Sequence, residues 1–255
     1  MSSTLLVGGA FRAPALAPAT IAMMRSWLVI ALSFVAGCTH DWGSLEPDLD
    51  EGLLLELAFE GGEAVDRTAS AEVAVHGATP SGSALSFDGD DDLEVTFGAP
   101  LVLGRAYTVS AWIRPEPSGD QFAVLSCHGE PGVILRTQGS RVVGIGYDAW
   151  TSDWPDYAVT EDAGLALEGW QHVALTVDES DLALYVDGER VRERSVTPTP
   201  PRADHEPTCW IGRSGYSWME HHFVGEIDEV RIYGRTLAPR EVEWLAARCP
   251  GDCVP

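Results

Sequence analysis

The sequence predicts an all-β fold, a sandwich of two antiparallel sheets with one short helix near the C-terminus. Three observations favour this fold class. Apolar and polar residues alternate over short segments, Gly, Pro, Asp and Ser fill the intervals, and a helical apolar pattern is convincing only over residues 239–247. Eleven or more strands in about two hundred residues, with no helices between them, are typical of a two-sheet sandwich.

The predicted strands begin at residue 53. Apolar alternation or enrichment in β-branched and aromatic residues predicts strands at 53–59, 84–87, 93–97, 107–113, 122–126, 132–137, 142–147, 170–178, 182–186, 208–212 and 226–233. Asp187-Gly188 predicts a tight hairpin turn, after which Glu189 begins the return strand. Pro239 is a typical first residue for the helix, whose apolar side chains fall on one side.

The composition excludes several classes of protein. Of the 255 residues, 45% are hydrophobic and 22% are charged, which is ordinary globular usage and excludes a disordered, collagenous or coiled-coil chain. The 16 cationic side chains are all Arg and face 39 Asp and Glu, so the net charge is −23. This charge disfavours binding to nucleic acid or anionic lipid. It supplies carboxylates for a hard cation such as calcium without locating a site.

Residues 1–37 are predicted to be an export signal. Arg25 supplies a positive charge, residues 26–36 are apolar, and Val35-Ala36-Gly37-Cys38 follows at once. The apolar stretch is too short to span a bilayer, which takes about 20 residues. The tetrapeptide resembles the bacterial lipobox, and an ordinary signal peptide is the alternative. Met23 or Met24 is a better start for this signal than Met1.

The resemblance to the lipobox implies that Cys38 is diacylated and becomes the first residue of the mature protein. Two acyl chains would anchor the protein stably. Thr39, rather than Asp, follows the cysteine, and by the lipoprotein sorting rule this implies delivery to the outer membrane of the bacterial cell envelope. Residues 38–52 are then the lipidated cysteine and a polar, acidic tether.

The other four cysteines are an even number in an oxidising compartment, which allows three disulfide pairings. We favour Cys249–Cys253, which closes a short loop in the tail at 248–255, and Cys127–Cys209, which joins two strand ends. A zinc site is the competing interpretation. Four zinc ligands need closely spaced pairs, and Cys127 and Cys209 have no such neighbour.

Four segments carry a family resemblance in the correct order and spacing. They are ALSFDGDDDLEV at 84–95, YTVSAWIRPEP at 107–117, GWQHVALTVDESDLALYVDGERV at 169–191 and the run from WIGRSGY to PREVEWL at 210–245. Together they resemble the concanavalin A-like, laminin G-type jelly roll in its bacterial pentraxin-like form. The resemblance covers about residues 53–247. It implies a binding or adhesive module directed to carbohydrate or protein partners, often with a structural calcium ion.

The same resemblance nominates calcium ligands. Positions that match the family's site are Glu60, Asp66 and Asp228, and backbone carbonyls near Gly61 or Gly89 would complete the six to eight oxygens that calcium needs. A second source of ligands is an acidic run that otherwise forms a solvated turn between two strands, Asp88, Asp90, Asp91 and Asp92.

Catalysis is disfavoured by the segment Glu226-Ile227-Asp228-Glu229. It resembles the catalytic strand of β-glucanases on the same jelly roll, but a retaining glycosidase needs two carboxyl groups about 5–5.5 Å apart. The only second Glu, Glu229, follows Asp228 directly and is expected on the opposite face of the strand. His172 is expected to be a hydrogen-bonded structural residue. The sequence therefore predicts a protein that is not an enzyme, with a glycoside hydrolase as the alternative.

Aromatic residues outside the strand pattern indicate a ligand face. Two polar, turn-rich stretches concentrate them, and loops are where binding residues gather. The candidate ligand residues are Trp150, Trp154, Tyr157, Tyr216 and Trp218. We expect a lipid-anchored, non-catalytic surface module that recognises a carbohydrate or a protein; a purely structural envelope protein is a further alternative, in which these rings cap the sandwich.

Overall fold

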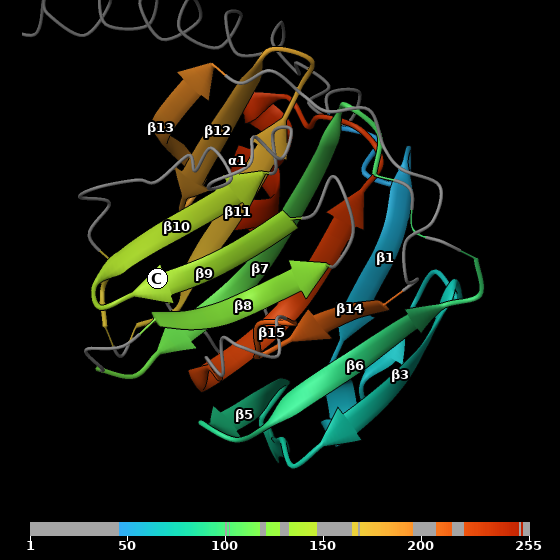
Figure 1. Ribbon diagram of the computed structural model, residues 1–255, viewed down its shortest axis with the longest axis vertical. Helices are drawn as coiled ribbons and strands as arrows, with labels where there is room; N and C mark the ends of the chain where they lie inside the picture. The colour runs from blue at the N-terminus through green and yellow to red at the C-terminus, as the bar shows by residue number, and fades with distance from the viewer. Residues whose placement is uncertain are drawn as a thin grey trace, which may run out of the picture. The chain divides into compact units, whose positions relative to one another are not determined.

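The computed structural model describes residues 46–99, 101, 103–117, 121–127, 133–146, 165–167, 169–195, 208–215, 222–249 and 251. The chain divides into two units, residues 1–46 and residues 47–255. The strands and the helix reported below all belong to the second unit (Figure 1). No helix in the described ranges is long and apolar enough to cross a membrane.

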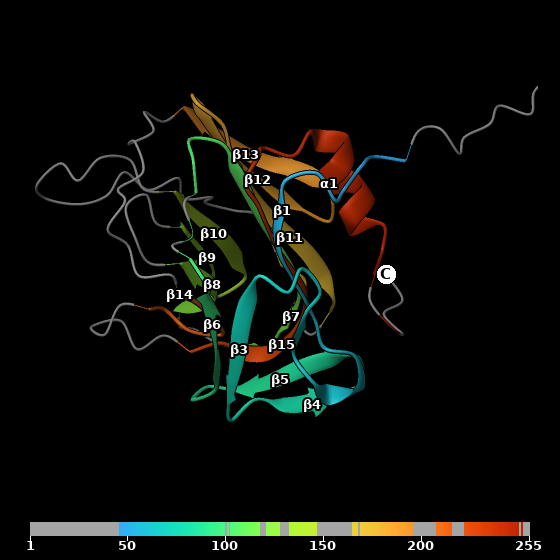
Figure 2. The same cartoon turned by 90° about the vertical axis from the view of Figure 1, so that its right-hand side faces the viewer.

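The described strands form two antiparallel sheets, which confirms the predicted jelly-roll sandwich (Figures 1 and 2). The larger sheet, sheet A, is ordered β13 (Glu189–Ser195), β12 (Asp181–Val186), β11 (Gln171–Val177), β7 (Tyr107–Pro115), β15 (Val224–Tyr233), β1 (Leu53–Ala58) and β2 (Val65–Asp66). β5 (Ala84–Asp88) also pairs with β15, and β4 (Thr79–Ser81) pairs with β5. The 3-10 turn η2 (Glu60–Gly62) follows β1.

The smaller sheet, sheet B, is ordered β10 (Arg141–Gly146), β9 (Val133–Gln138), β8 (Gln121–Cys127), β14 (Thr208–Ile211), β6 (Asp92–Phe97) and β3 (Ala71–His76). The inward side chains of the two sheets form one continuous apolar core, because alternate residues of each strand point to the same face. On β15, for example, Ile227 and Ile232 are fully buried in this core.

The helix α1 (Pro239–Ala246) covers part of the outer face of sheet A (Figure 2). Val242 and Leu245 pack there against Tyr185 and Tyr233. Glu241 fixes the start of the helix, since its carboxylate accepts the backbone N–H of Ala238 at 2.7 Å. The predicted helix at 239–247 is thereby confirmed.

The predicted Cys127–Cys209 disulfide is confirmed. The two residues are direct cross-strand partners on β8 and β14, with their Cα atoms 4.1 Å apart. Cys249 is also disulfide-bonded. Its predicted partner, Cys253, lies outside the described residues, as does Cys38.

Candidate functional site

The strand β15 brings the acidic segment to the outer face of sheet A. Because Ile227 is fully buried in the core, its neighbours Glu226 and Asp228 point away from the core. In the register of the sheet, Glu226 lies beside Arg114 of β7 and Ser86 of β5. Three segments that are far apart in the sequence therefore meet at one place on this face.

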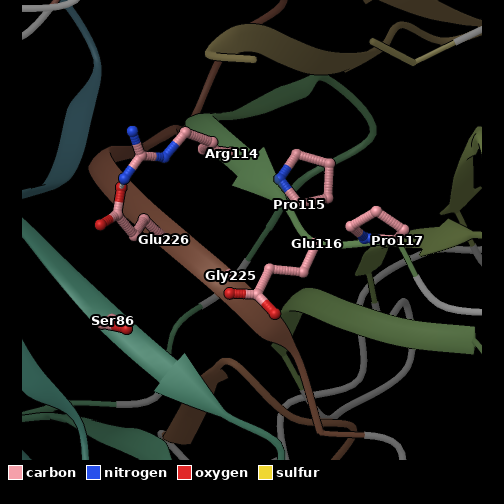
Figure 3. Close-up of a pocket in the computed structure, with 7 residues that line it drawn as sticks. All are labelled: Ser86, Arg114, Pro115, Glu116, Pro117, Gly225 and Glu226. Carbon is pink, nitrogen blue, oxygen red and sulfur yellow. Dashed lines mark ion pairs between the residues drawn. The ribbon is translucent and has the colours of Figure 1, made fainter. Parts of the chain in front are cut away.

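A pocket of about 460 Å³ opens at this place (Figure 3). Its volume is within the range of small-ligand sites, about 300–1,000 Å³. The lining comes from β5, from the end of β7 with the residues that follow it, and from the start of β15: Ser86, Arg114, Pro115, Glu116, Pro117, Gly225 and Glu226.

Gly225 allows the chain to approach closely at the pocket. Its φ is 133°, which favours glycine, and a Cβ there would lie 2.3 Å from the carbonyl oxygen of Arg114. The backbone N–H of Glu116 donates to the carbonyl of Val224 at 3.1 Å, which ties β7 to β15 beside the pocket. The lining is therefore held by the backbone of two strands.

The three charged side chains of the pocket differ in their contacts: Arg114 and Glu226 form an ion pair, and Glu116 lies outside it. The Glu226 carboxylate accepts a hydrogen bond from the Ser81 hydroxyl on one oxygen and pairs with Arg114 on the other. Arg114 also lies over the ring of Trp170, 5.5 Å from its centroid. Glu116 is exposed and forms no ion pair with any described residue. Figure 3 shows its carboxylate apart from the Arg114–Glu226 pair.

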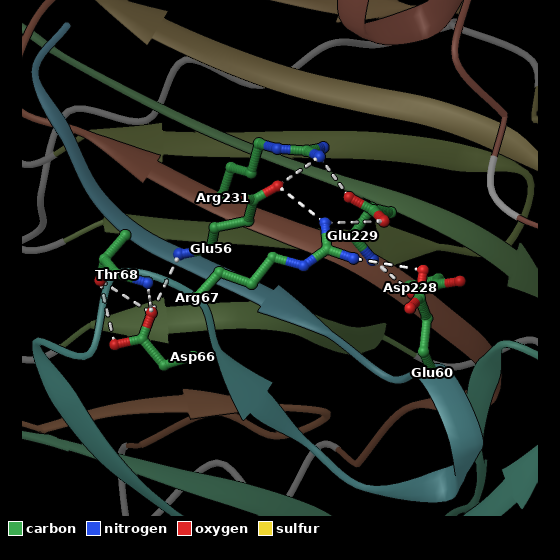
Figure 4. A network of polar contacts seen from close by, with 8 residues as sticks. All are labelled: Glu56, Glu60, Asp66, Arg67, Thr68, Asp228, Glu229 and Arg231. Carbon is green, nitrogen blue, oxygen red and sulfur yellow. Dashed lines mark hydrogen bonds and ion pairs between the residues drawn. The ribbon is translucent and has the colours of Figure 1, made fainter. Parts of the chain in front are cut away.

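Further along β15, a network of ion pairs occupies the same face of the sheet (Figure 4). Arg231 pairs with Glu56 of β1 at 2.9 Å and with Glu229. Arg67 pairs with Glu56 at 3.3 Å, with Glu60 at 3.2 Å and with Glu229 at 4.0 Å. Two guanidinium groups thus hold three carboxylates.

The position of Glu229 corrects the sequence prediction, which expected it on the opposite face from Asp228. The register of β15 against β7 shifts between Asp228 and Arg231, and Glu229 has a φ of 50°. Such a bulge adds a residue to one strand and breaks the simple alternation of side chains. The Glu229 carboxylate consequently reaches Arg231 on the outer face.

The predicted calcium ligands Glu60, Asp66 and Asp228 are not gathered around one point, since their ligand atoms do not all lie within 4.8 Å of one another. The Glu60 side chain is 77% exposed and pairs with Arg67. Asp66 and Asp228 lie at opposite ends of the network in Figure 4. The Asp66 carboxylate is occupied by hydrogen bonds from Thr68 and Ser70, among others.

The pKa values of Asp66 and Asp228 differ from that of an ordinary aspartate in opposite directions. Burial alone would raise the pKa of Asp66, but hydrogen bonds from Thr68 and Ser70 hold it below its usual value. Burial raises the pKa of Asp228 to about 6, although its carboxylate accepts the backbone N–H of Glu229 at 2.8 Å. Asp228 thus holds its proton more strongly than an ordinary aspartate.

Three of the four residues in the second predicted set of calcium ligands, Asp88, Asp90, Asp91 and Asp92, lie close together. Ligand oxygens of Asp88, Asp90 and Asp91 lie within 4.8 Å of one another, and this is the only such group among the described residues. A hydrogen bond with Asp88 and the negative charge of the Asp88 carboxylate both raise the pKa of Asp90. Asp92 is engaged elsewhere, with His76 at 2.8 Å and Arg213 at 3.4 Å.

His172 is structural, but not in the way the sequence predicted. It is fully buried on β11, and neither ring nitrogen has a hydrogen-bond partner. Its ring packs edge-on against Trp112, with 5.6 Å between the centroids. Burial, assisted by the positive charge of Arg231, lowers the pKa of His172 to about 3, so the ring is neutral at pH 7.

The aromatic ligand residues predicted from the sequence, Trp150, Trp154, Tyr157, Tyr216 and Trp218, all lie outside the described residues. Sequence reasoning in turn missed Arg114 and Glu116 as site residues. One signal was available, because Arg114 and Glu116 flank Pro115 at the end of a predicted strand. Nothing in the sequence, however, shows that this end lies beside Glu226.

A laminin G-type model of the Concanavalin A-like lectin/glucanases superfamily matches residues 87–243, more than half of the chain. The chain belongs to this superfamily. The match confirms the family resemblance of the four sequence segments, and it includes most of the residues that line the pocket.

Among curated proteins, the chain is similar to adhesion G-protein coupled receptor V1 of Danio rerio. The identity is 25% over 171 residues, which is 62% of this chain and 3% of the receptor. This chain therefore matches only a small part of that relative.

Among solved structures, the fold is similar to the ligand binding domain of botulinum neurotoxin serotype D, in complex with N-acetylneuraminic acid. The TM-score is 0.63 and the identity 15%, over 77% of this chain and 50% of that one. The serotype G binding domain is similar at a TM-score of 0.59 and 16% identity, over 76% of this chain and 50% of that one. The chain spans about half the length of these domains, and the likeness shows the fold alone.

Proposed function

We propose that this superfamily member is a non-catalytic binding module and that a carbohydrate occupies the pocket lined by Arg114, Glu116 and Glu226. The observation that carries the proposal is the pocket itself, a ligand-sized hollow with charged hydrogen-bonding groups held in place by two strands. Arg114 supplies N–H donors, while Glu116 and Glu226 supply acceptors. Sugar hydroxyls need both kinds of partner.

The comparisons support a carbohydrate as the ligand. The superfamily's description includes lectins, and the serotype D domain was solved with a sugar acid bound. The half-buried ring of Trp170 beside Arg114 adds an aromatic surface next to the pocket, which suits the apolar face of a sugar.

The contacts of Glu226 suit recognition of a ligand hydroxyl. One oxygen of its carboxylate accepts from the Ser81 hydroxyl and the other pairs with Arg114, so the group is held in one orientation. Each oxygen keeps a lone pair that can accept a hydrogen bond from a sugar hydroxyl. Glycoside hydrolysis with retention would also need a second carboxyl group about 5–5.5 Å away to act as the acid.

A glycan array probed with the purified full-length protein tests the proposal. We expect binding to a defined set of glycans and a loss of at least tenfold in Arg114→Gln. Arg192→Gln is the matched control, because Arg192 is exposed on β13 of the same sheet and forms no ion pair with a described residue. If no glycan is retained, or if both variants bind as well as the parent, the proposal is wrong.

We also propose a structural calcium ion at Asp88, Asp90 and Asp91, whose oxygens are close enough to share one cation. An ion that binds only the folded state raises its stability by about 2.7 kcal/mol at a hundredfold excess over Kd. Thermal unfolding with calcium should therefore occur several degrees higher than with chelator, and Asp90→Asn should reduce the difference. Identical unfolding curves for the parent would exclude the ion.

Finally, we propose that the module is displayed on the bacterial cell envelope through diacylated Cys38. The sequence of the export signal and the lipobox-like tetrapeptide support this placement. Metabolic labelling with a tagged fatty acid should mark the parent and not Cys38→Ser. Equal labelling of the two proteins would end the proposal.

A further inference from the structure

We infer that the pocket lined by Arg114, Glu116 and Glu226 selects uncharged or amine-bearing sugars and rejects anionic ones. This inference rests on the proposed function, and it adds the chemical class of the ligand. It is carried by the charges of the pocket, whose lining holds one guanidinium group, that of Arg114, and two carboxylates, those of Glu116 and Glu226.

The positive charge of Arg114 is already neutralised by an ion pair within the protein. Its partner Glu226 has a side chain only 11% exposed, and the two are in direct contact. A sugar carboxylate or sulfate could reach the guanidinium only by competing with Glu226. That competition would leave the Glu226 carboxylate largely buried without its cation, which is costly.

Glu116 adds a second obstacle to an anionic ligand. It is exposed at the pocket, and within the described part of the chain no cationic side chain pairs with it. Charges beyond about 8 Å are largely screened at physiological ionic strength. Discrimination therefore depends on Glu116 and Glu226 more than on the net charge of −23.

The same groups favour hydroxyls and amines. A carboxylate accepts hydrogen bonds from a sugar hydroxyl without a change in charge, and it pairs with the ammonium group of an amino sugar. The exposed N–H groups of Arg114, whose side chain is 43% exposed, can donate to ring or hydroxyl oxygens while the pair with Glu226 persists. Pro115 and Pro117 add apolar surface to the lining.

The test compares glycans that share a core and differ in charge. The full-length protein would be probed with neutral oligosaccharides, with glucosamine oligomers, and with glycans ending in N-acetylneuraminic acid, glucuronic acid or sulfate. We expect the neutral or amine-bearing glycans to bind at least tenfold more tightly than the anionic ones. Glu226→Gln, which releases Arg114, should strengthen binding to the anionic set, and Glu116→Gln should weaken the preference for amines.

Glu72→Gln is the control, because Glu72 is exposed on β3 of the other sheet and should leave the selectivity unchanged. If the parent binds anionic glycans as tightly as neutral ones or better, the inference fails and the proposed function stands. If no glycan of any class binds, both fail together. Unchanged selectivity in both Glu116→Gln and Glu226→Gln would also overturn the inference.

Discussion

The pocket and the ion-pair network lie on successive stretches of β15 and on the same face of sheet A, yet they use arginine in opposite ways. In the network, Arg67 and Arg231 together contact Glu56, Glu60 and Glu229, and the side chains themselves fill the surface. In the pocket, Arg114 contacts one carboxylate beside an unfilled hollow. An arginine–carboxylate pair indicates a ligand site only where space has been left next to it.

The backbone of β15 accounts for the difference between the two regions. The bulge at Glu229 brings an additional carboxylate to the outer face, where it closes the network. At the pocket, Gly225 contributes no side chain, and the backbone of β15 lies against that of β7. The outer face of β15 is therefore covered by ion-paired side chains around Glu229 and Arg231, whereas a pocket remains beside Gly225 and Glu226.

The largest effect should come from removing the centre of the network. The Arg231, Glu56 and Glu229 side chains are only 14–17% exposed, so Arg231→Ala leaves two largely buried carboxylates without this cation. We expect a loss of about 3 kcal/mol in the free energy of unfolding, measured by urea titration. Arg67→Ala is the control, since its side chain is 41% exposed and an exposed pair contributes up to about 1 kcal/mol. Equal losses would contradict the central role of Arg231.

The second prediction concerns acid stability and His172, which lies beside the network under the influence of Arg231. Its folded pKa, about 3, is below the unfolded value of about 6.5. The unfolded state therefore binds a proton that the folded state excludes, and stability is lost as the pH falls below 6.5. Between pH 7 and pH 4 this loss should reach about 3 kcal/mol.

His172→Phe should unfold with a flatter dependence on pH over this range, because phenylalanine keeps a ring against Trp112 without a titrating group. The measurement is urea unfolding at pH 4, 5, 6 and 7. A slope in His172→Phe as steep as in the parent would show that His172 does not govern acid stability.

The third prediction has the opposite sign and concerns Asp228, at the junction of the pocket and the network. Burial raises its folded pKa to about 6, above the unfolded value of about 3.9. Protonation therefore stabilises the folded state in acid, and this contribution is lost as the pH rises through 6. From pH 4 to pH 7 the loss should be about 2 kcal/mol. Asp228→Asn should remove it, so that the variant gains stability relative to the parent as the pH rises; no relative gain would contradict the raised pKa.

Sequence reasoning predicted most of the fold because the core strands carry strong local signals. Each of the eleven predicted strands is present, and β2, β3 and β4 were missed; β2 has only two residues. β4 contains Pro80, which argues against a strand, and the residues of β3 are half-buried or exposed, so its apolar signal is weak. Local pattern is sufficient where a strand is buried and fails where it lies at an exposed edge.

The candidate site could be predicted only in part, for two physical reasons. The acidic strand was recognised, but strict alternation was assumed along it, whereas the spacing of the apolar residues Ile227, Val230 and Ile232 breaks that alternation at the bulge that turns Glu229 outward. The pocket depends on the register that places Ser86, Arg114 and Glu226 side by side. Register is a property of pairing between distant segments, and one sequence without its fold does not contain it.

The smallest effect on stability, and the largest on binding, is expected from Arg114→Gln. Arg114 is 43% exposed, and although Glu226 is only 11% exposed, the Gln amide can still donate a hydrogen bond to it, so the substitution should lower the free energy of unfolding by only about 1 kcal/mol. Glycan retention, by contrast, should fall at least tenfold, because the pocket loses its guanidinium donors while its volume remains. Urea unfolding and glycan binding measured on the same preparation separate the two quantities. A variant whose free energy of unfolding falls by several kcal/mol, but which still retains glycans, would show that Arg114 is a structural residue like Arg67 and Arg231. The pocket and the network would then not differ in how they use arginine.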